Sequence, residues 1–212
     1  MATTKHKKHT IVATLRRIEL FSKGVPGKPK ATKHTLSVSL PWLRTTISGR
    51  TWPRVVEMDG MERDYAAGDW CDAILFKETI QAPAAMELSL TPPMTDAALT
   101  KLFAAIGKAS LGILGDMVEK SIEGKIAKLA GVSFDQVGAL LASAAPDPIG
   151  EGRLQLDDDL LDNGGVRTIE LVAKHDILRT QSAASGRATK RVPLVRKGEK
   201  TAEITIEFEC VE

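Results

Sequence analysis

Residues 201–211, TAEITIEFECV, decide the fold class, because apolar and charged side chains alternate along them. Glutamates take three of the alternate positions, and the apolar members share the other parity: Ile204, Ile206, Phe208 and Cys210. An alternation of period two puts the apolar side chains on one face of a β-strand. The sequence therefore predicts a strand with one buried face, and we expect it to lie within a sheet.

Eight further segments of β-forming composition are spread over the chain. They are residues 9–21, 34–43, 52–58, 72–80, 84–93, 152–156, 166–177 and 190–197. In the first of them the apolar parity shifts at Arg16 and Arg17, which predicts a β-bulge. The second alternates cleanly, with Leu36, Val38, Leu40 and Trp42 on one parity, and this is typical of a half-buried strand.

The middle of the chain has a helical period instead. Apolar residues between 95 and 145 recur at the spacing of one helix face. Thr95 suits a helix N-cap, Gly131 suits a stop, and Ser133 begins a second helix with capping-box spacing. These signals predict a two-helix hairpin over residues 95–145.

Short strands without repeated strand–helix alternation favour an antiparallel architecture. We expect a mainly β protein, α+β by content: an antiparallel β-sandwich of about 8–9 strands, C2-like or immunoglobulin-like by architectural analogy, with the helical hairpin inserted at 95–145. Residues 1–212 then form one domain, since the strands after the insertion complete the sheets. Residues 1–9 are expected to be a flexible basic tail.

Composition narrows the class of protein. The chain has 212 residues and a formal net charge of +2, so bulk charge does not indicate a polyanion binder. The N-terminus has no apolar run of the secretory kind, and we expect a cytoplasmic protein. The two cysteines, Cys71 and Cys210, form no C-x-x-C motif; we expect them to be reduced, while a disulfide between them stays open.

Motifs of catalysis and cofactor binding do not occur in the sequence. The phosphate-binding, dinucleotide-binding, zinc-protease and hydrolase patterns are all missing, and two of the four histidines, His6 and His9, lie in the basic segment. We therefore expect a non-catalytic binding module without a cofactor. An enzyme whose site is assembled from scattered residues remains the second alternative.

The stretch LQLDDDLLDNGG, residues 154–165, raises the question of a metal ion. Its spacing fails the EF-hand pattern, but carboxylates from two loops can together bind calcium. A second acidic segment at 57–72 would supply such partners, and the candidate ligands are Asp157, Asp159, Asp162, Asp64 and Asp69. The simpler interpretation, which we favour, is a polar hairpin loop built on Asp-Asn-Gly-Gly turn chemistry.

The N-terminal segment is basic, with nine Lys and Arg and one acid before His34. Contacts to anionic lipid or another anion would fall on Lys5, Lys7, Lys8, Arg16, Arg17, Lys28 and Lys30. A peripheral membrane module is thus the first alternative function. Nucleic acid is not favoured, because no aromatic residues are interleaved with the cations.

Residues 102–115, LFAAIGKASLGILG, combine an apolar stripe with three glycines. We expect this stripe to pack against the sheet or the second helix. If it is exposed, it becomes an interaction surface formed by Leu102, Phe103, Ile106 and Ile113, or a membrane-active segment. The partner expected overall is a protein, with an anionic membrane and a homo-oligomer as the other partners considered.

Overall fold

A computed structural model of the chain describes residues 7–24, 32–41, 50–65, 73–93, 100, 147–182 and 189–211. Within these residues it contains eleven strands and one short helix, and every pair of neighbouring strands runs antiparallel. The predicted mainly β, antiparallel character is confirmed. The elements are β1 (Lys8–Leu20), β2 (Thr32–Leu40), β3 (Arg50–Met58), β4 (Glu62–Asp64), β5 (Ile74–Gln81), β6 (Ala84–Thr91), β7 (Gly150–Leu156), α5 (Asp158–Asn163), β8 (Gly165–Val172), β9 (Ile177–Ser182), β10 (Thr189–Val195) and β11 (Lys200–Val211).

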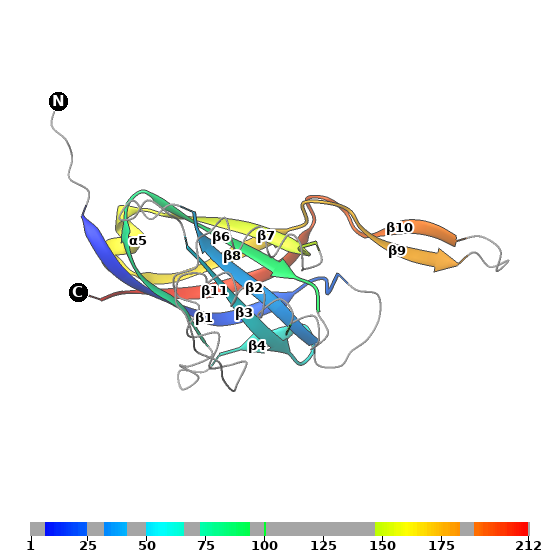
Figure 1. Ribbon diagram of the computed structural model, residues 1–212, viewed down its shortest axis with the longest axis horizontal. Helices are drawn as coiled ribbons and strands as arrows, with labels where there is room; N and C mark the ends of the chain where they lie inside the picture. Colours follow the sequence, from blue (N-terminus) through cyan, green and yellow to red (C-terminus); the bar gives the residue numbers. More distant parts are fainter. Residues whose placement is uncertain are drawn as a thin grey trace, which may run out of the picture.

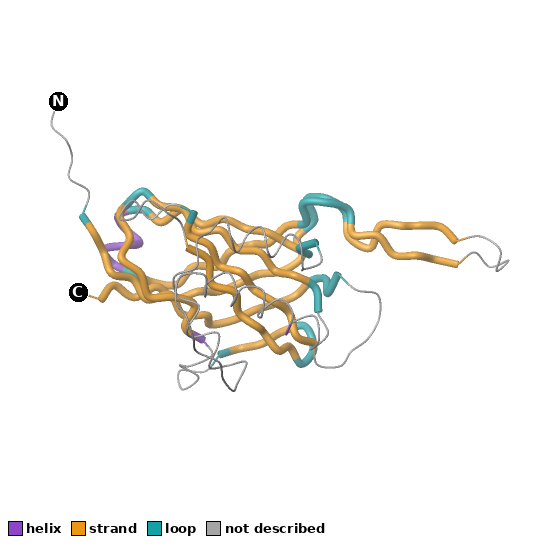
Figure 2. The backbone as a smooth tube through the Cα atoms, in the orientation of Figure 1, coloured by secondary structure: helices purple, strands orange, loops and turns teal. Residues whose placement is uncertain are grey.

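Nine of the strands belong to one hydrogen-bonded sheet rather than to two. Its order is β3-β2-β6-β7-β8-β11-β1-β4, and β5 also pairs with β1. The sheet curls until its two ends approach each other (Figures 1 and 2). β11 lies between β8 and β1, as its alternation predicts, and β9 and β10 form a separate two-stranded ribbon.

The predicted bulge in β1 explains how one strand serves three neighbours. The register against β11 shifts between Leu15 and Arg17, where the parity of the sequence changes. Before the bulge β1 pairs with β5, and after it β1 pairs with β4 through Arg17, Ile18 and Glu19. A bulge bends and twists a strand, so it turns the far half of β1 toward a new partner.

A single hydrophobic core lines one face of the curled sheet. Ile204, Ile206 and Phe208 are buried as predicted, whereas Cys210 is exposed, because it lies near the end of β11. The half-buried prediction for β2 is wrong, since Thr35 and Ser37 on its polar face are buried as well. β2 is an interior strand of the sheet, paired with β3 and β6, and the alternation of its residues does not show that its polar face is shielded from water as well.

Side chains, not a ladder of backbone bonds, connect β3 to β5 where the sheet nearly closes. The Trp52 and Phe76 rings stack with centroids 4.9 Å apart. Arg50 forms an ion pair with Glu78, and Arg54 donates a hydrogen bond to the carbonyl of Ile74. We call this set of contacts the seam.

Several predicted segments lie elsewhere than expected or outside the described residues. The helical hairpin at 95–145 lies outside them except for Thr100, as do residues 1–6 of the expected tail, while Lys8 and His9 belong to β1. Strands from before and after residues 94–146 are neighbours in the sheet, as β6–β7 and β1–β11 show. The short strand β4 has no counterpart in the sequence prediction.

The strand predicted at 166–177 ends early, at Val172, and the last residue of that segment, Ile177, begins β9. β8 ends at Val172, and Ala173 exchanges backbone hydrogen bonds with the turn after β10: its N–H donates to Glu199, and its carbonyl accepts from Gly198. Asp176 also accepts a hydrogen bond from the backbone of Lys197 at 2.8 Å. Beyond these bonds β9 leaves the body with β10 (Figure 1).

Candidate functional site

The acidic stretch folds into the short helix α5, so the predicted plain hairpin loop is not what connects β7 to β8. Asp157 is its N-cap, and its carboxylate accepts the backbone N–H of Leu160 at 2.9 Å. Asp158 and Asp159 lie in the first turn, where a negative charge interacts favourably with the helix dipole. Leu160 and Leu161 are buried in the core, and this explains why two leucines interrupt the acids.

The last aspartate of α5 faces the start of β1. Asp162 accepts a hydrogen bond from Lys7 at 3.1 Å, and its carboxylate lies 3.6 Å from Nδ1 of His9. The His9 ring is buried, and neither of its nitrogens has a hydrogen-bond partner among the described residues. Asp159 accepts a hydrogen bond from Asn163 and lies 4.0 Å from Arg167. Each of these aspartates therefore has a role in holding α5 in place.

Among the described candidate metal ligands, Asp64 lies far from the aspartates of α5. Asp162 lies beside Lys7 and His9, whereas Asp64 pairs in register with Arg17, eight residues further along β1. Eight residues of strand span roughly 26 Å. Asp69 lies outside the described residues. Within the part of the chain that the structure describes, no group of three or more His, Cys, Asp or Glu side chains is placed to hold a metal ion.

Three of the described cations predicted to contact an anion are engaged in ion pairs. Lys7 pairs with Asp162, Arg16 with Glu207, and Arg17 with Glu62 at 2.6 Å. Lys8 is exposed. Lys5, Lys28 and Lys30 lie outside the described residues. Anion contacts by this segment, and the membrane class that they support, stay predictions.

A basic arm projects from the body. We define the arm as residues 177–198, which include β9, β10 and the turn that follows; the structure describes 177–182 and 189–198 of it. Figure 1 shows β9 and β10 extending away from the sheet along the long axis of the molecule. The sequence of the arm has no acid and six cations: Arg179, Arg187, Lys190, Arg191, Arg196 and Lys197.

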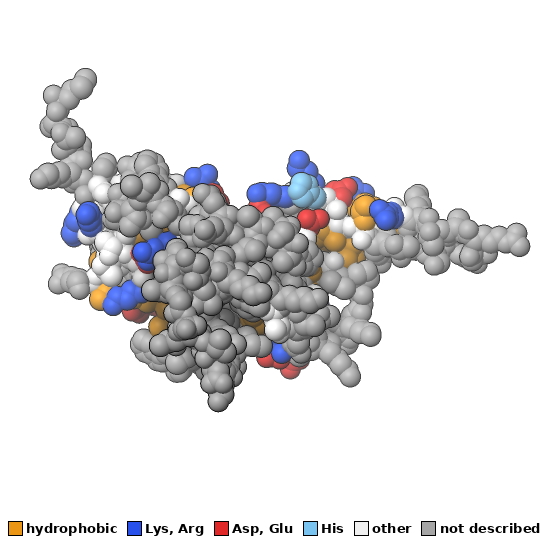
Figure 3. Space-filling model, viewed as in Figure 1, with side chains coloured by type: hydrophobic (Ala, Val, Ile, Leu, Met, Phe, Trp, Pro, Cys, Tyr) orange, Lys and Arg blue, Asp and Glu red, His pale blue; other side chains and the backbone are white. Residues whose placement is uncertain are grey.

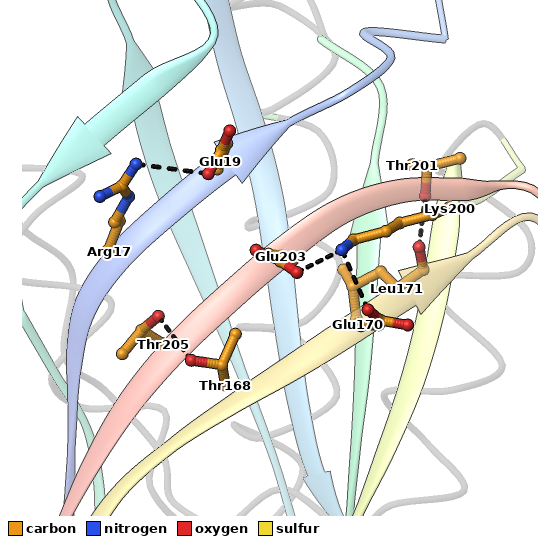
Figure 4. A network of polar contacts seen from close by, with 9 residues as sticks. All are labelled: Arg17, Glu19, Thr168, Glu170, Leu171, Lys200, Thr201, Glu203 and Thr205. Carbon is orange, nitrogen blue, oxygen red and sulfur yellow. Dashed lines mark hydrogen bonds and ion pairs between the residues drawn. The ribbon is translucent and has the colours of Figure 1, made fainter.

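The root of the arm is fastened by polar contacts between β8 and β11 (Figure 4). Lys200 donates hydrogen bonds to Glu203 and to Glu170, the latter at 3.0 Å, and Thr201 donates to the carbonyl of Leu171 at 3.1 Å. The bonds to Glu203 and then Glu170 raise the pKa of Lys200 above its ordinary value of 10.5. The register places Glu19, Glu203 and Glu170 in one row across three strands. The contacts of Lys200 with two of these glutamates therefore offset the repulsion between their like charges.

Exposed hydrophobic side chains gather at the root of the arm. Among the described residues five large hydrophobic side chains are exposed, and four of them form what we call the rim: Phe21 (48%), Met61 (39%), Val172 (38%) and Leu178 (49%). The fifth, Val166, lies at the other end of β8. In Figure 3 hydrophobic atoms lie beside basic and acidic ones where the arm leaves the body.

Backbone hydrogen bonds link the segments that carry the rim side chains. Leu20 donates to the carbonyl of Met61 at 2.6 Å, and Phe21 donates to the carbonyl of Thr201 at 2.8 Å. Lys200, the neighbour of Thr201, pairs in register with Val172 and lies 4.9 Å above the Phe21 ring. The rim therefore runs from the β3–β4 turn across β1 and β11 to β8 and the arm.

Acidic side chains flank the rim on the side away from the arm. We call them the acidic corner: Glu57, Asp59, Glu62 and Asp64, all exposed. Two arginines lie among them, and both have partners: Arg17 contacts Glu62, while Arg63 donates to the carbonyl of Glu57 and lies 4.6 Å from the Tyr65 ring centroid. Lys33 also pairs in register with Glu57 across β2 and β3, so the four acids exceed the three neighbouring cations by one charge.

The remaining predicted features give no site with described geometry. The surface formed by Leu102, Phe103, Ile106 and Ile113 lies outside the described residues. A depression of about 270 Å³ lies over β6 and β7, and its charged lining residues are Glu87 and Arg153. In the described ranges no helix is long and apolar enough to cross a membrane.

The cations of the arm stand out in the sequence, but their pattern favours a solvated loop. The arm is formed by the pairing of 177–182 with 189–195. The sequence only hints at this pairing, through Ser-Gly at 185–186 and the weak strand pattern at 190–197. No protein-family model matches this chain, and no curated protein matches it either. A role for the rim, the arm and the acidic corner therefore has to be inferred from their own geometry.

Proposed function

We propose that this protein is a non-catalytic interaction module that binds a protein partner through the rim and the basic arm. The observation that carries the proposal is the gathering of four of the five described exposed hydrophobic side chains at the root of the arm. Apolar side chains surrounded by charged ones are typical of a protein–protein interface, whose core is apolar and whose border is polar.

The arm adds a second argument. An isolated two-stranded ribbon is marginally stable at best in water, because it has no apolar face to bury. Within the described residues β9 and β10 pair only with each other. Both strands expose backbone donors and acceptors along their outer edges, which a partner can use. A partner that pairs with these edges would therefore stabilise the arm.

Site-specific photo-crosslinking in the native host tests this proposal. The crosslinking residue p-benzoylphenylalanine replaces Leu178 in the arm or Phe21 on the rim, which are exposed to similar extents. Val166, exposed at the other end of β8, is the matched control position. We expect discrete adducts with protein from Leu178 and Phe21 and none from Val166.

Two outcomes would contradict the proposal. One is the absence of any protein adduct from Leu178 and Phe21 while the chain is folded and abundant. The other is an equal set of adducts from Val166, because a surface that is merely sticky would capture neighbours at any exposed apolar position.

The finer architecture is part of the same proposal. We propose that the facing halves of the curled sheet act as the two layers of a sandwich, and that residues 95–145 form a two-helix insertion between β6 and β7. The support for the insertion is the helical period of those residues. Backbone chemical shifts measured by NMR test it: helical shifts over about 95–130 and 133–145 are expected, and random-coil shifts would contradict it.

A further inference from the structure

We propose that the partner is a second copy of this chain, bound in a two-fold dimer in which each arm lies against the acidic corner of the other copy. This inference rests on the proposed function, since it names the protein that the rim and the arm bind. Three observations support it: the shared location of the arm and the corner, their opposite charges, and the direction of the arm.

The arm and the acidic corner lie at the same end of the sheet. The corner is joined to the end of β1 by the bond from Leu20 to Met61, and β1 is joined to β11 by the bond from Phe21 to Thr201. The corner and the root of the arm are thus separated by two strand spacings, about 10 Å. When two copies face each other with this end, one symmetry axis brings each arm to the opposite corner and brings the two rims together. A two-fold interface uses the same patch twice, so that patch must contain both complementary parts, as this one does.

The charges of the arm and of the remaining chain are opposite. The chain has 29 Lys and Arg against 27 Asp and Glu, so without the six cations of the arm the remainder carries four more acids than cations. Exposed acids of the corner supply the local counterpart. Complementary charge at the border of an interface sets orientation and accelerates association.

The outer part of the arm leads away from the acidic corner of its own molecule. Six residues of strand in β9 extend about 20 Å, and the ribbon leads away from the body (Figure 1). The exposed Arg191 of β10 pairs with Thr180, three residues beyond Ile177, so it lies about 10 Å out along the ribbon, where the corner of a second copy can reach it.

Nucleic acid and anionic membrane are less well supported as partners of the arm. The sequence of the arm contains no aromatic residue on which bases could stack. The acidic remainder would repel the phosphates next to the contact. The rim also contributes hydrophobic side chains, which a phosphate backbone leaves exposed to water.

Sedimentation equilibrium of the purified full-length chain over a wide range of concentration tests the inference. A monomer–dimer equilibrium is expected, and its dissociation constant should rise by about tenfold or more between low and high salt, because salt screens exposed charges. A chain that stays monomeric at every concentration overturns the inference. If the photo-crosslinks from Leu178 then contain a different protein, the proposed function stands; if they contain no protein, both fail.

A charge-swap series makes the test specific. The arm variant is Arg191→Glu with Arg196→Glu, and the corner variant is Asp59→Lys with Asp64→Lys. Each variant alone should be monomeric, because both of its contacts place like charges together. An equal mixture of the two should form a heterodimer, and a chain with all four substitutions should form a homodimer, because every arm then meets a corner of opposite charge.

Matched controls separate the contact between arm and corner from a general effect of charge. Lys8→Glu with Lys77→Glu makes the same change in net charge as the arm variant, but on exposed positions of β1 and β5. This control variant should leave the dimer intact. Dimerisation that neither the arm nor the corner variant disturbs overturns the inference. So does a monomeric wild-type chain that binds duplex DNA or phosphatidylserine vesicles through Arg191, because the partner is then a polyanion.

Discussion

Gly164 determines how the chain leaves α5 and enters β8. It caps the helix with a φ of 66°, a conformation that residues with a Cβ rarely adopt. A Cβ at this position would also lie 2.4 Å from the carbonyl oxygen of Phe208 on β11, and a backbone atom cannot easily move away. Two separate constraints thus act on one residue, and the sequence shows only the first of them, as turn chemistry.

Replacement of Gly164 by alanine should lower the free energy of unfolding by about 1–3 kcal/mol, because it adds backbone strain and a steric contact. Gly60→Ala is the matched control, since Gly60 has a φ of 96° and a Cβ there would meet no atom within 4 Å. Urea denaturation of both variants measures the difference. Equal losses for the two would show that the contact with Phe208 has no effect.

Lys200 provides a pH-dependent contact at the root of the arm. Its pKa in the folded chain is raised by Glu203 and then Glu170, so the contact stabilises the fold below the ordinary value of 10.5 and is lost as the pH rises through the raised value. Glu203→Gln should move the pKa of Lys200 back toward 10.5, because Glu203 has the largest effect. An NMR titration of the lysine Nζ group measures this, and an unchanged midpoint would contradict the contact.

At the scale of elements, the arm and the body have different sources of stability. Ile177 packs against the core and Val195 is buried, so the ends of the arm belong to the body. Between them Leu178 is exposed, and the described arm residues contribute nothing to the core cluster beyond Ile177. We therefore expect the body to fold without the arm.

Replacement of residues 178–194 by Asn-Gly should leave the melting temperature of the body nearly unchanged. The dipeptide forms a two-residue hairpin turn between Ile177 and Val195, which are already paired. Thermal unfolding followed by circular dichroism measures the effect. A large drop in melting temperature would mean that the arm stabilises the body. The arm would then have a structural role, and a binding partner would not be needed to explain it.

At the scale of the whole molecule, the seam keeps the sheet curled. The stacked rings of Trp52 and Phe76 link β3 to β5, and Glu78 of the nearby ion pair is mostly buried, with 13% of its side chain exposed. Loss of Arg50 would leave this carboxylate largely buried without a compensating charge, which is costly. The closure therefore depends on pairs of side chains more than on backbone hydrogen bonds.

A double-mutant cycle on Trp52→Leu and Phe76→Leu should give a coupling energy of about 0.5–1.5 kcal/mol, the range measured for aromatic pairs. The coupling comes from denaturation of the two single variants and the double variant. Additive losses would show that the two rings act independently and that the seam is not a unit.

The sequence could predict features that depend on neighbours along the chain. The alternation in β11 and the parity shift in β1 both indicate their structures directly. The seam and the rim could not be predicted, because their residues come from distant segments: Phe21, Met61, Val172 and Leu178 share no local pattern. The helix α5 could not be predicted either, because six residues rich in aspartate resemble a turn until Leu160 and Leu161 are seen to be buried.

Hydrogen exchange of the arm amides in the purified chain, followed by mass spectrometry as concentration rises, tests the central claim most directly. If the arm binds a second copy, peptides from 177–182 and 189–195 gain protection as the dimer forms, while peptides around Val166 stay unchanged. The arm variant Arg191→Glu with Arg196→Glu should show no such gain. Arm amides that exchange at the same rate at every concentration would contradict the account.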